Sequence, residues 1–311
     1  MKKYSGIVVV GSVGFDVIMG LPGRFADWIM PEKIGELNVS FTVESLRREY
    51  GGTGGNCAYT LGLLGVKPRL VSVLGKDGLG YRKHLARVGV DVSELGMDKS
   101  SFSAVGHVMT DKDNNQIWSY YPGPLVKMED YRLQMLVKPG DLVVLLPSYP
   151  KAFGKHLREV VKMGNDFLFD PAFFIPNLSV ADLGLGLREA AIVIGNEYEI
   201  TLMEKRTGIK VREGNKIVIM TMGERGSVIY QGAKRWQIPA VKVKRIVDPT
   251  GAGDAYRAGF LVGYIAGNYP EECGRMGALT GAWCVEHQGT QNHQFTHKEF
   301  RERLYGNKDK S

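Results

Sequence analysis

Residues 248–260, DPTGAGDAYRAGF, place two carboxylates around a glycine-rich turn. Gly251 and Gly253 permit a sharp turn and let a ligand approach the backbone, and the sequence becomes helical from Asp254 onward. Such a turn leaves backbone N–H groups unpaired at a helix N-terminus, which is a binding site for an anion. The Asp254 carboxylate either caps this helix or acts on the bound ligand, and the stretch taken alone favours the cap.

Four other glycine-rich or polar stretches stand where predicted strands end. They are GGTGGNCAYTLGLLG at 51–65, GNEYE at 195–199, TMGERG at 221–226, and Asp16 after the apolar start of the chain. The first leads into a helix with Asn56 near its start, so it is either a turn before a tightly packed helix or a backbone that approaches a hydroxylated ligand. Because parallel α/β sheets bind ligands beyond the carboxyl ends of their strands, the five stretches together predict one ligand cleft.

Short apolar runs alternate with helical patterns along most of the chain. The runs typical of buried parallel strands are 6–11, 69–75, 141–147, 166–171, 191–196 and 216–223. The segments of helical character between them are 56–65, 80–89, 155–164 and 196–208. This order predicts a doubly wound, mainly parallel α/β sheet flanked by helices.

Two segments break this alternation, at 17–50 and at about 101–124. The first contains alternating residues at 36–43, ELNVSFTV, and the second predicts two strands around the turn DKDNNQ at 111–116. Both are interpreted as a small β-structured lid inserted into the α/β body. The segment 241–247, VKVKRIV, is expected to be extended up to Asp248.

The composition excludes several classes of function. A chain of 311 residues, 44% hydrophobic and 23% charged, suits a large α/β core, and it has no apolar run of the ~18 residues that a membrane span needs. The net charge of +7 is spread among acidic residues without a basic, aromatic-rich block, so no nucleic-acid partner is expected. Cys57, Cys273 and Cys284 indicate reduced packing residues in a cytoplasmic protein. His293 and His297 are expected at the surface.

The motifs at 51–65 and 248–261 occur together, in this order and far apart, and GKDGLG at 75–80 and GVD at 89–91 accompany them. This arrangement resembles the ribokinase-like, or phosphofructokinase-B type, family of carbohydrate and nucleoside kinases over nearly the whole chain. The chain has no GxxxxGK[ST] loop and no GxGxxG pattern near its start, so a P-loop kinase and a dinucleotide fold are disfavoured. The resemblance implies a single ribokinase-like kinase domain covering 1–311, with the lid described above.

The resemblance also implies roles for individual residues in phosphoryl transfer from ATP. Asp254 would be the general base, while the amides of the preceding turn would hold the charge of the transferred group. These amides belong to Gly251, Ala252 and Gly253. The acceptor would be bound through its hydroxyl groups by Asp16, Gly52 and Asn56.

Further residues match the family elements that hold the nucleotide. The turn expected to lie along ATP consists of Thr221, Gly223 and Gly226. Asn196 and Glu199 match an N-x-x-E element that organises Mg²⁺ and phosphates largely through water. Asp248 stands where some relatives bind a monovalent cation, so the resemblance also allows K⁺ there.

The acceptor is the feature that the sequence determines least. Thr53 replaces a Lys that is common in the sugar kinases, and the gap from Asp16 to Gly51 is long, which favours prokaryotic adenosine or nucleoside kinases. The leading hypothesis is an ATP-dependent kinase of a nucleoside 5′-hydroxyl. The alternatives are a kinase for ribose, fructose or a related sugar acid, and an inactive relative that binds nucleotide and regulates. A homodimer through the lid is allowed. The aromatic residues that either stack on a base or fill the lid core are Phe41, Trp118, Tyr120, Tyr121 and Phe173.

Overall fold

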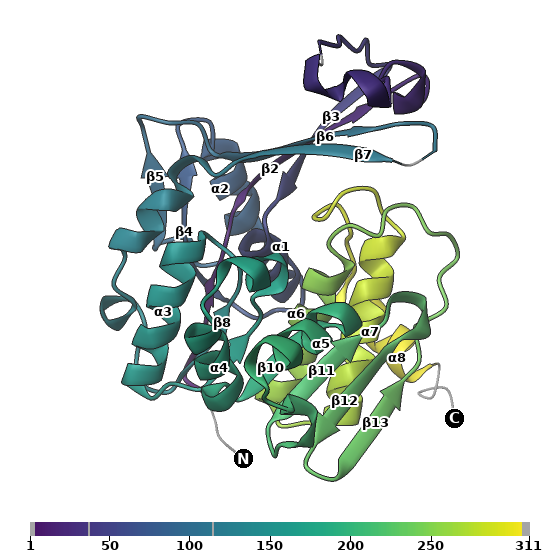
Figure 1. Cartoon of the computed structure of the whole chain (residues 1–311). Coiled ribbons are helices and arrows are strands. Elements are labelled where there is room, and N and C mark those ends of the chain that lie inside the picture. Colours follow the sequence, from purple (N-terminus) through teal and green to yellow (C-terminus); the bar gives the residue numbers. More distant parts are fainter. Residues whose placement is uncertain (1–3, 37, 114, 307–311) are drawn as a thin grey trace.

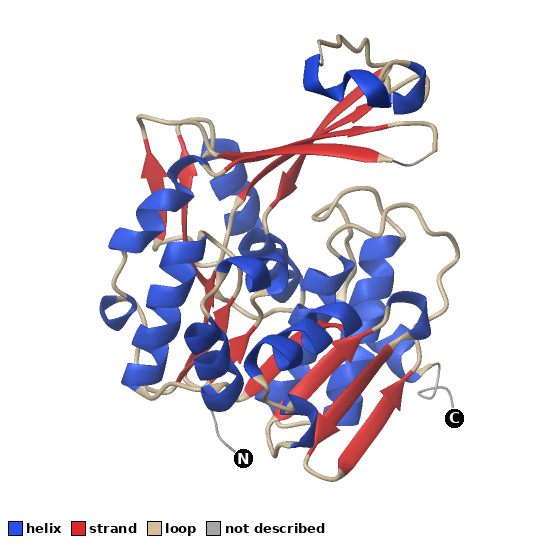
Figure 2. Ribbon diagram, in the orientation of Figure 1, coloured by secondary structure: helices blue, strands red, loops and turns tan. Residues whose placement is uncertain are grey.

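The fold is described by a computed structural model, shown in Figure 1. It describes residues 4–36, 38–113 and 115–306, so the remaining parts of the expected 1–311 domain and of its two lid segments lie outside the described residues. Figure 2 shows two bodies of secondary structure: a large sheet covered by helices, and a small sheet that projects from it.

The large sheet has nine strands in the order β13-β12-β11-β10-β9-β8-β1-β4-β5. Their bounds are β1 (Gly6–Val10), β4 (Arg69–Gly75), β5 (Leu95–Asp98), β8 (Asp141–Leu145), β9 (Phe167–Phe169), β10 (Ile192–Asn196), β11 (Ile217–Thr221), β12 (Ser227–Gln231) and β13 (Lys234–Ile238). All neighbours pair in parallel except the β11–β12 and β12–β13 pairs, which are antiparallel. The six strands predicted from apolar runs are confirmed.

Helices cover both faces of this sheet because its strands are apolar on both sides. In β1, Val8 and Val10 pack into one core cluster, whereas Ile7 and Val9 pack into the other. The first cluster is closed by α3 (Pro150–Met163), α4 (Val180–Glu189) and α5 (Glu197–Thr207). The second is closed by α1 (Thr53–Leu63), α2 (Leu79–Arg87), α6 (Ala252–Ala266) and α7 (Pro270–Val285), and α8 (His297–Tyr305) packs on α7. The doubly wound fold class is therefore confirmed.

The small sheet has four strands in the order β3-β2-β6-β7. Their bounds are β2 (Gly14–Gly20), β3 (Ser45–Gly51), β6 (Ala104–Thr110) and β7 (Gln116–Tyr121). Asp16 lies inside β2, so it belongs to this sheet and not to the end of the first strand of the large one. Figure 1 shows the sheet projecting from the upper end of the larger body, with two short 3-10 helices (Phe25–Asp27 and Pro31–Glu36) at its tip.

Two segments that were expected to be extended or alternating belong to no strand of either sheet. Residues 38–43 form no strand, because Phe41 packs edge-on against Phe25 and Trp28 at the tip of the small sheet. The segment 241–247 also forms no strand, and the amide of Val247 donates instead to the carbonyl of Val285. Val241, Val243 and Ile246 of this segment line a cleft instead.

Candidate active site

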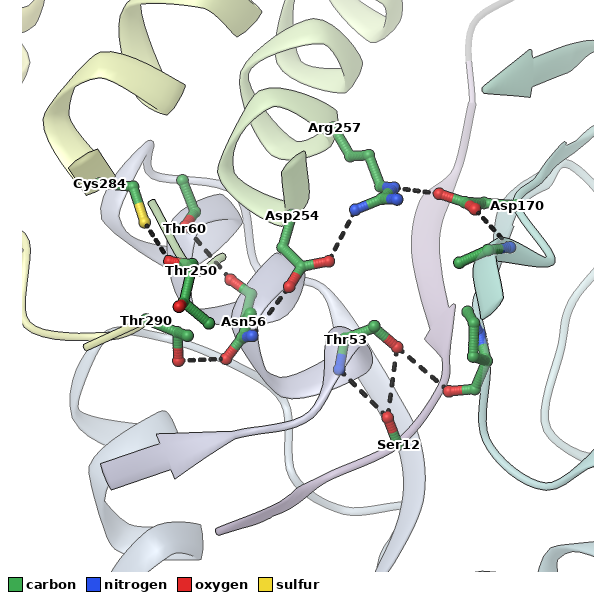
Figure 3. A network of polar contacts seen from close by, with 12 residues as sticks. Ser12, Thr53, Asn56, Thr60, Asp170, Thr250, Asp254, Arg257, Cys284 and Thr290 are labelled. Atoms are coloured by element: carbon green, nitrogen blue, oxygen red, sulfur yellow. Dashed lines mark hydrogen bonds and ion pairs between the residues drawn. The ribbon is translucent and has the colours of Figure 1, made fainter. Parts of the chain in front are cut away.

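The two glycine motifs meet in the centre of the molecule, where α1 and α6 begin. Asn56 of α1 donates a hydrogen bond of 2.8 Å from Nδ2 to Oδ2 of Asp254 in the first turn of α6 (Figure 3). Both side chains are buried. The fold therefore brings together two stretches that the sequence places far apart.

Asp254 does not cap its own helix. Its second oxygen, Oδ1, accepts a hydrogen bond of 2.7 Å from Nη1 of Arg257, one turn further along α6. Burial raises the pKa of this carboxyl group, while Arg257 and Asn56 act to lower it. The capping interpretation is thus wrong, and the site holds a buried carboxylate with one partner on each oxygen.

Asn56 is itself fully engaged on its oxygen side. Its Oδ1 accepts hydrogen bonds from Thr290 Oγ1 at 2.7 Å and from Gln291 Nε2 at 2.8 Å. The Gln291 amide also contacts the Tyr81 hydroxyl, which donates to the carbonyl of Gly51. Asn56 stays a predicted substrate-binding residue beside Asp16, and within the protein its side chain contacts Asp254 and these supporting groups.

The turn before α6 presents backbone amides beside Asp254. Gly251 has a φ of 80°, a left-handed conformation that favours glycine, and it is the N-cap residue of the helix. The amide of Ala252 donates to the carbonyl of Pro249 at a long 3.2 Å. Within the described ranges, no protein acceptor lies in reach of the amides of Gly251 and Gly253. Two of the three amides expected to hold an anion are therefore available to one.

A cleft of about 590 Å³ opens beside this turn. Thr221, Gly223 and Gly226 line it from the end of β11, and Ala252 and Gly253 line it from the start of α6. Its apolar wall consists of Val241, Val243, Ile246, Tyr256, Ala278, Ala282 and Val285. This lining suits an apolar ring system with an anionic group directed at the N-terminus of α6.

Asn196 and Glu199 form a reciprocal cap at the start of α5. The Glu199 amide donates to Asn196 Oδ1 at 2.9 Å, and the Asn196 amide donates to Glu199 Oε2 at 2.7 Å. Asn196 also pairs with Thr221 across β10 and β11, which connects this cap to the cleft. Burial, followed by the charge of Asp170, raises the pKa of Glu199. In the described part of the chain, no three acidic, His or Cys side chains gather closely enough to hold a metal ion.

Asp16 lies on a row of residues that crosses the small sheet. The register pairs it with Glu49 of β3 and with Gly106 of β6, and pairs Gly106 in turn with Tyr120 of β7. A side chain at Gly106 would contact Asp16 Oδ1 at 3.1 Å, so glycine keeps the space beside this carboxylate open. Burial, followed by the charges of Asp254, Asp248 and Glu49, raises the pKa of Asp16 to about 6.

Two other predicted residues have defined places nearby. Gly52 is the N-cap of α1 and has a φ of 88°. Asp248 accepts hydrogen bonds from the amides of Thr250 at 2.9 Å and Gly289 at 3.0 Å, so its carboxylate fixes two loops at the mouth of the site.

Sequence reasoning missed Arg257 and Asp170. Both are buried and form an ion pair, and Arg257 connects this pair to Asp254. A charged residue on the otherwise apolar and small-residue face of α6 was the available signal, because a buried arginine requires a partner.

His293 was expected at the surface and is buried. Its ring contacts Thr60 Oγ1 at 3.0 Å and packs edge-on against Tyr59, and burial lowers its pKa to about 4. The approach of the 290–295 segment to α1, which the sequence does not reveal, accounts for this position.

Comparison with known proteins identifies the class to which this fold and site belong. The model of the pfkB family carbohydrate kinase matches residues 7–297. The chain therefore belongs to the pfkB family of carbohydrate kinases and is an ATP-dependent kinase.

Several of the similar proteins are nucleoside kinases. The chain is 31% identical to a nucleoside kinase of Methanocaldococcus jannaschii, with 97% of each chain covered, and 30% identical to one of Methanothermobacter thermautotrophicus, with 94% and 93% covered. The solved structure of the Burkholderia thailandensis nucleoside kinase in complex with inosine superimposes with a TM-score of 0.85 at 32% identity, covering 96% of this chain and 97% of that one. The same kinase is also known in complex with ADP-inosine.

None of the helices within 4–36, 38–113 and 115–306 is long and apolar enough to cross a membrane.

Proposed function

We propose that this kinase transfers the γ-phosphoryl group of ATP to the 5′-hydroxyl of a nucleoside, with adenosine as the first candidate. The observation that carries the proposal is the buried Asp254 carboxylate beside the available amides of Gly251 and Gly253. The likeness to nucleoside kinases over nearly the whole chain, one of them solved with inosine, supports a nucleoside as acceptor.

In the proposed reaction, Asp254 accepts the proton of the 5′-hydroxyl as its oxygen attacks the γ-phosphorus. The bond between that phosphorus and the bridging oxygen breaks, and its electron pair leaves with ADP. The amides of Gly251 and Gly253, with the less strongly bonded amide of Ala252, stabilise the negative charge on the transferred group. The base that accepts the proton and the amides that stabilise the negative charge thus lie within four consecutive residues.

The 590 Å³ cleft is the proposed ATP site. Its apolar wall suits adenine, and Thr221, Gly223 and Gly226 lie along the path towards the helix N-terminus. Asn196 and Glu199 hydrogen-bond each other's backbone amides and do not surround a metal ion. They would therefore suit a Mg²⁺ ion that is held mainly by phosphates and water. Bound Mg²⁺ supplies neutralisation of phosphate charge. We also propose that a monovalent cation such as K⁺ binds near Asp248, whose carboxylate joins the loops of Thr250 and Gly289.

Asp16 is the proposed anchor of the ribose. Two carboxylate oxygens match a vicinal diol, and the same row of the sheet carries the open position at Gly106 and the ring of Tyr120. Gly52 begins α1 next to this row. This arrangement suits a diol attached to a flat base, since the base can lie against an aromatic side chain.

The small sheet is proposed to close over the acceptor as a lid formed by 17–50 and 101–124, within a single domain of 1–311. Closure would exclude water and limit ATP hydrolysis. The face opposite Asp16 carries an apolar row that supports a homodimer through the lid, namely Leu46, Met19, Met109 and Ile117. The free, buried cysteines support the expected cytoplasmic location.

The test is ATP-dependent phosphorylation of a panel containing adenosine, inosine, cytidine, ribose and fructose, with product identified by mass spectrometry. The proposal predicts a kcat/KM for at least one nucleoside that exceeds those for ribose and fructose by ~10²-fold or more. A sugar preference would establish the alternative of a sugar kinase, which the description of the matched family favours. ATP binding without transfer to any acceptor would establish a nucleotide-binding regulator.

A further inference from the structure

Arg257 connects two buried carboxylates in the centre of the site (Figure 3). Its Nη1 donates to Oδ1 of Asp254 at 2.7 Å, and its Nε contacts Oδ2 of Asp170. The other oxygen of Asp170 accepts a hydrogen bond of 3.0 Å from the amide of Ala172. Asp170 thus holds the guanidinium from the loop after β9, on the side away from Asp254.

This group of three side chains is strongly buried. Arg257 is 9% exposed, Asp254 7% and Asp170 0%. Two carboxylates and one guanidinium carry a formal charge of −1, so the group does not neutralise itself. A buried ion pair placed only for stability needs one acid for one base, and an uncompensated charge in this position is costly. The presence of Asp170 in addition to Asp254 is therefore not explained by packing alone.

We propose that Arg257 is the positioning residue of this kinase, and that its guanidinium, anchored by Asp170, fixes the orientation and the negative charge of the Asp254 carboxylate. The inference rests on the proposed function, in which Asp254 removes a proton from the acceptor hydroxyl. Arg257 touches neither substrate in this mechanism and acts through Asp254.

The orientation follows from the two oxygens of Asp254. Arg257 holds Oδ1 and Asn56 holds Oδ2, so the carboxylate cannot rotate without losing both hydrogen bonds. Each carboxylate oxygen accepts about two hydrogen bonds, which leaves one position on each for the acceptor hydroxyl. Only a planar guanidinium presents Nε and Nη1 at a fixed separation towards two different acids, and a Lys ammonium lacks this geometry.

The charge follows from the surroundings of Asp254. Burial raises its pKa most strongly, Arg257 and Asn56 lower it, and Asp170 raises it. The other titratable groups coupled to its charge come from the elements packed around it: Asp16 of β2, Cys57 of α1, Tyr81 of α2 and Cys284 of α7. Arg257 is the cation that contacts the carboxylate directly. Removing it should raise the pKa, and removing the Asp170 charge should lower it.

The experiment measures the single-turnover rate of phosphoryl transfer as a function of pH. The acceptor is saturating, so the rate reports the chemical step and not the pH-dependent binding of the acceptor by Asp16. Three variants separate charge from orientation: D170N, the double variant D170N/R257M, and R257K. The double variant avoids leaving two unpaired buried acids. R206M is the matched control, because Arg206 is a half-buried arginine that binds the carbonyls of Ile175 and Leu178 outside the site.

Relative to the wild type, D170N should move the acid limb of the profile to lower pH. D170N/R257M should move it upward by ~1–2 pH units, with activity partly restored by alkali. R257K should leave the limb within about 0.5 unit and lower the plateau rate by ~10-fold, since charge is kept and orientation is lost. R206M should change the melting temperature alone.

The inference is overturned if the double variant keeps the wild-type acid limb, or if R257K keeps the wild-type plateau, because a merely structural arginine would move neither. R257K retains the buried charge, so its plateau decides the matter even where the double variant does not fold. Failure of the proposed function looks different: either the wild type transfers no phosphoryl group, or D254N transfers it at the wild-type rate.

Discussion

Asn56 Nδ2 lies 2.8 Å from Asp254 Oδ2, although the two residues are separated by 198 positions in the sequence. This contact joins the glycine motif of α1 to that of α6 and places the acceptor side of the molecule against the proposed general base. The oxygen of Asn56 is held by Thr290 and Gln291, so the amide has one orientation. Because the orientation of the Asn56 amide is set by other residues, its hydrogen bond fixes the position of the Asp254 carboxylate.

Replacing Asn56 by alanine should weaken both the fold and the chemistry. The change removes the hydrogen bond to Asp254 and the oxygen that accepts from Thr290 and Gln291, which keep only their contacts with the Tyr50 carbonyl and the Tyr81 hydroxyl, so the free energy of unfolding should fall by about 2 kcal/mol. The kcat should fall ~10-fold, while the KM for ATP stays unchanged. Steady-state kinetics and urea unfolding measure these effects.

Asn165→Ala is the matched control, because the Asn165 amide is also held by hydrogen bonds, which it donates to the carbonyls of Lys138 and Asp141 and not to a residue of the site. Its kcat should equal that of the wild type. If both variants lose activity alike, Asn56 supports the fold and not the base.

Acceptor binding should depend on the protonation of Asp16. Its pKa is raised to about 6, first by burial and then by neighbouring carboxylates, so the neutral form already prevails at a pH where an ordinary Asp is ionised. A neutral carboxyl accepts hydroxyl hydrogens less well. The KM for the acceptor should therefore rise ~10-fold for each pH unit below 6, while the KM for ATP remains flat. In Asp16→Asn the acceptor KM should be high at every pH, and a wild-type acceptor KM that stays constant down to pH 5 would remove Asp16 from the site.

Gly251→Ala should abolish transfer and cost stability. Gly251 has a φ of 80°, and a Cβ there would lie 2.9 Å from the side chain of Thr290. We expect a loss of about 2 kcal/mol in the free energy of unfolding and at least ~10²-fold in kcat, because the turn that carries the amides must move.

Gly89→Ala provides the control for backbone strain alone. Gly89 has a φ of 88° and lies just after α2, where a Cβ atom would meet no other atom within 4 Å. Its unfolding free energy should drop by about 1 kcal/mol with full activity. Equal activity in the two variants would contradict a role for the 249–253 turn in catalysis.

Gly106→Val should impair the use of the nucleoside without affecting the binding of ATP. A Cβ at this position would lie 3.1 Å from Asp16 Oδ1 and 3.2 Å from the Trp118 ring, so the added methyl groups would occupy the proposed nucleoside position. The kcat/KM for nucleosides should fall ~10²-fold, with ATP affinity unchanged in calorimetry. Gly35→Val, at an open position of the proposed lid, should have wild-type kinetics. A wild-type kcat/KM in Gly106→Val would move the acceptor off this face of the sheet.

The parallel strands were predictable because they are buried on both faces and therefore appear as continuous apolar runs. The antiparallel hairpin of β12 and β13 was missed, because SVIYQ and KRWQI lack a regular alternation and the turn between them, Gly232-Ala233, has no Asn-Gly or Asp-Gly signal. The strands on either side of the turn at 111–116 were found, whereas residues 38–43 of the alternating stretch form no strand and Phe41 packs against Phe25 and Trp28 at the tip.

The site was predictable as far as its glycine motifs and isolated acids. The sequence alone does not reveal which side chains face one another. Asp170 and Arg257 are 87 positions apart and become partners only when the fold brings the loop after β9 to the first turns of α6. Asn56 was assigned to substrate because an amide near a glycine turn suits a hydroxyl, and its neighbours Thr290 and Gln291 come from the opposite end of the chain.

The most direct test of Asp254 as the general base follows the phosphoryl group in ³¹P NMR, using ATP and adenosine with the wild type and with Asp254→Asn. The Asn side chain keeps the size of the carboxylate and cannot accept the proton. We expect equal amounts of ADP and nucleoside 5′-monophosphate with the wild type, and a transfer rate at least ~10²-fold lower with Asp254→Asn despite unchanged binding of both substrates. A fully active Asp254→Asn enzyme, or a phosphate on another hydroxyl of the ribose, would contradict the proposed mechanism.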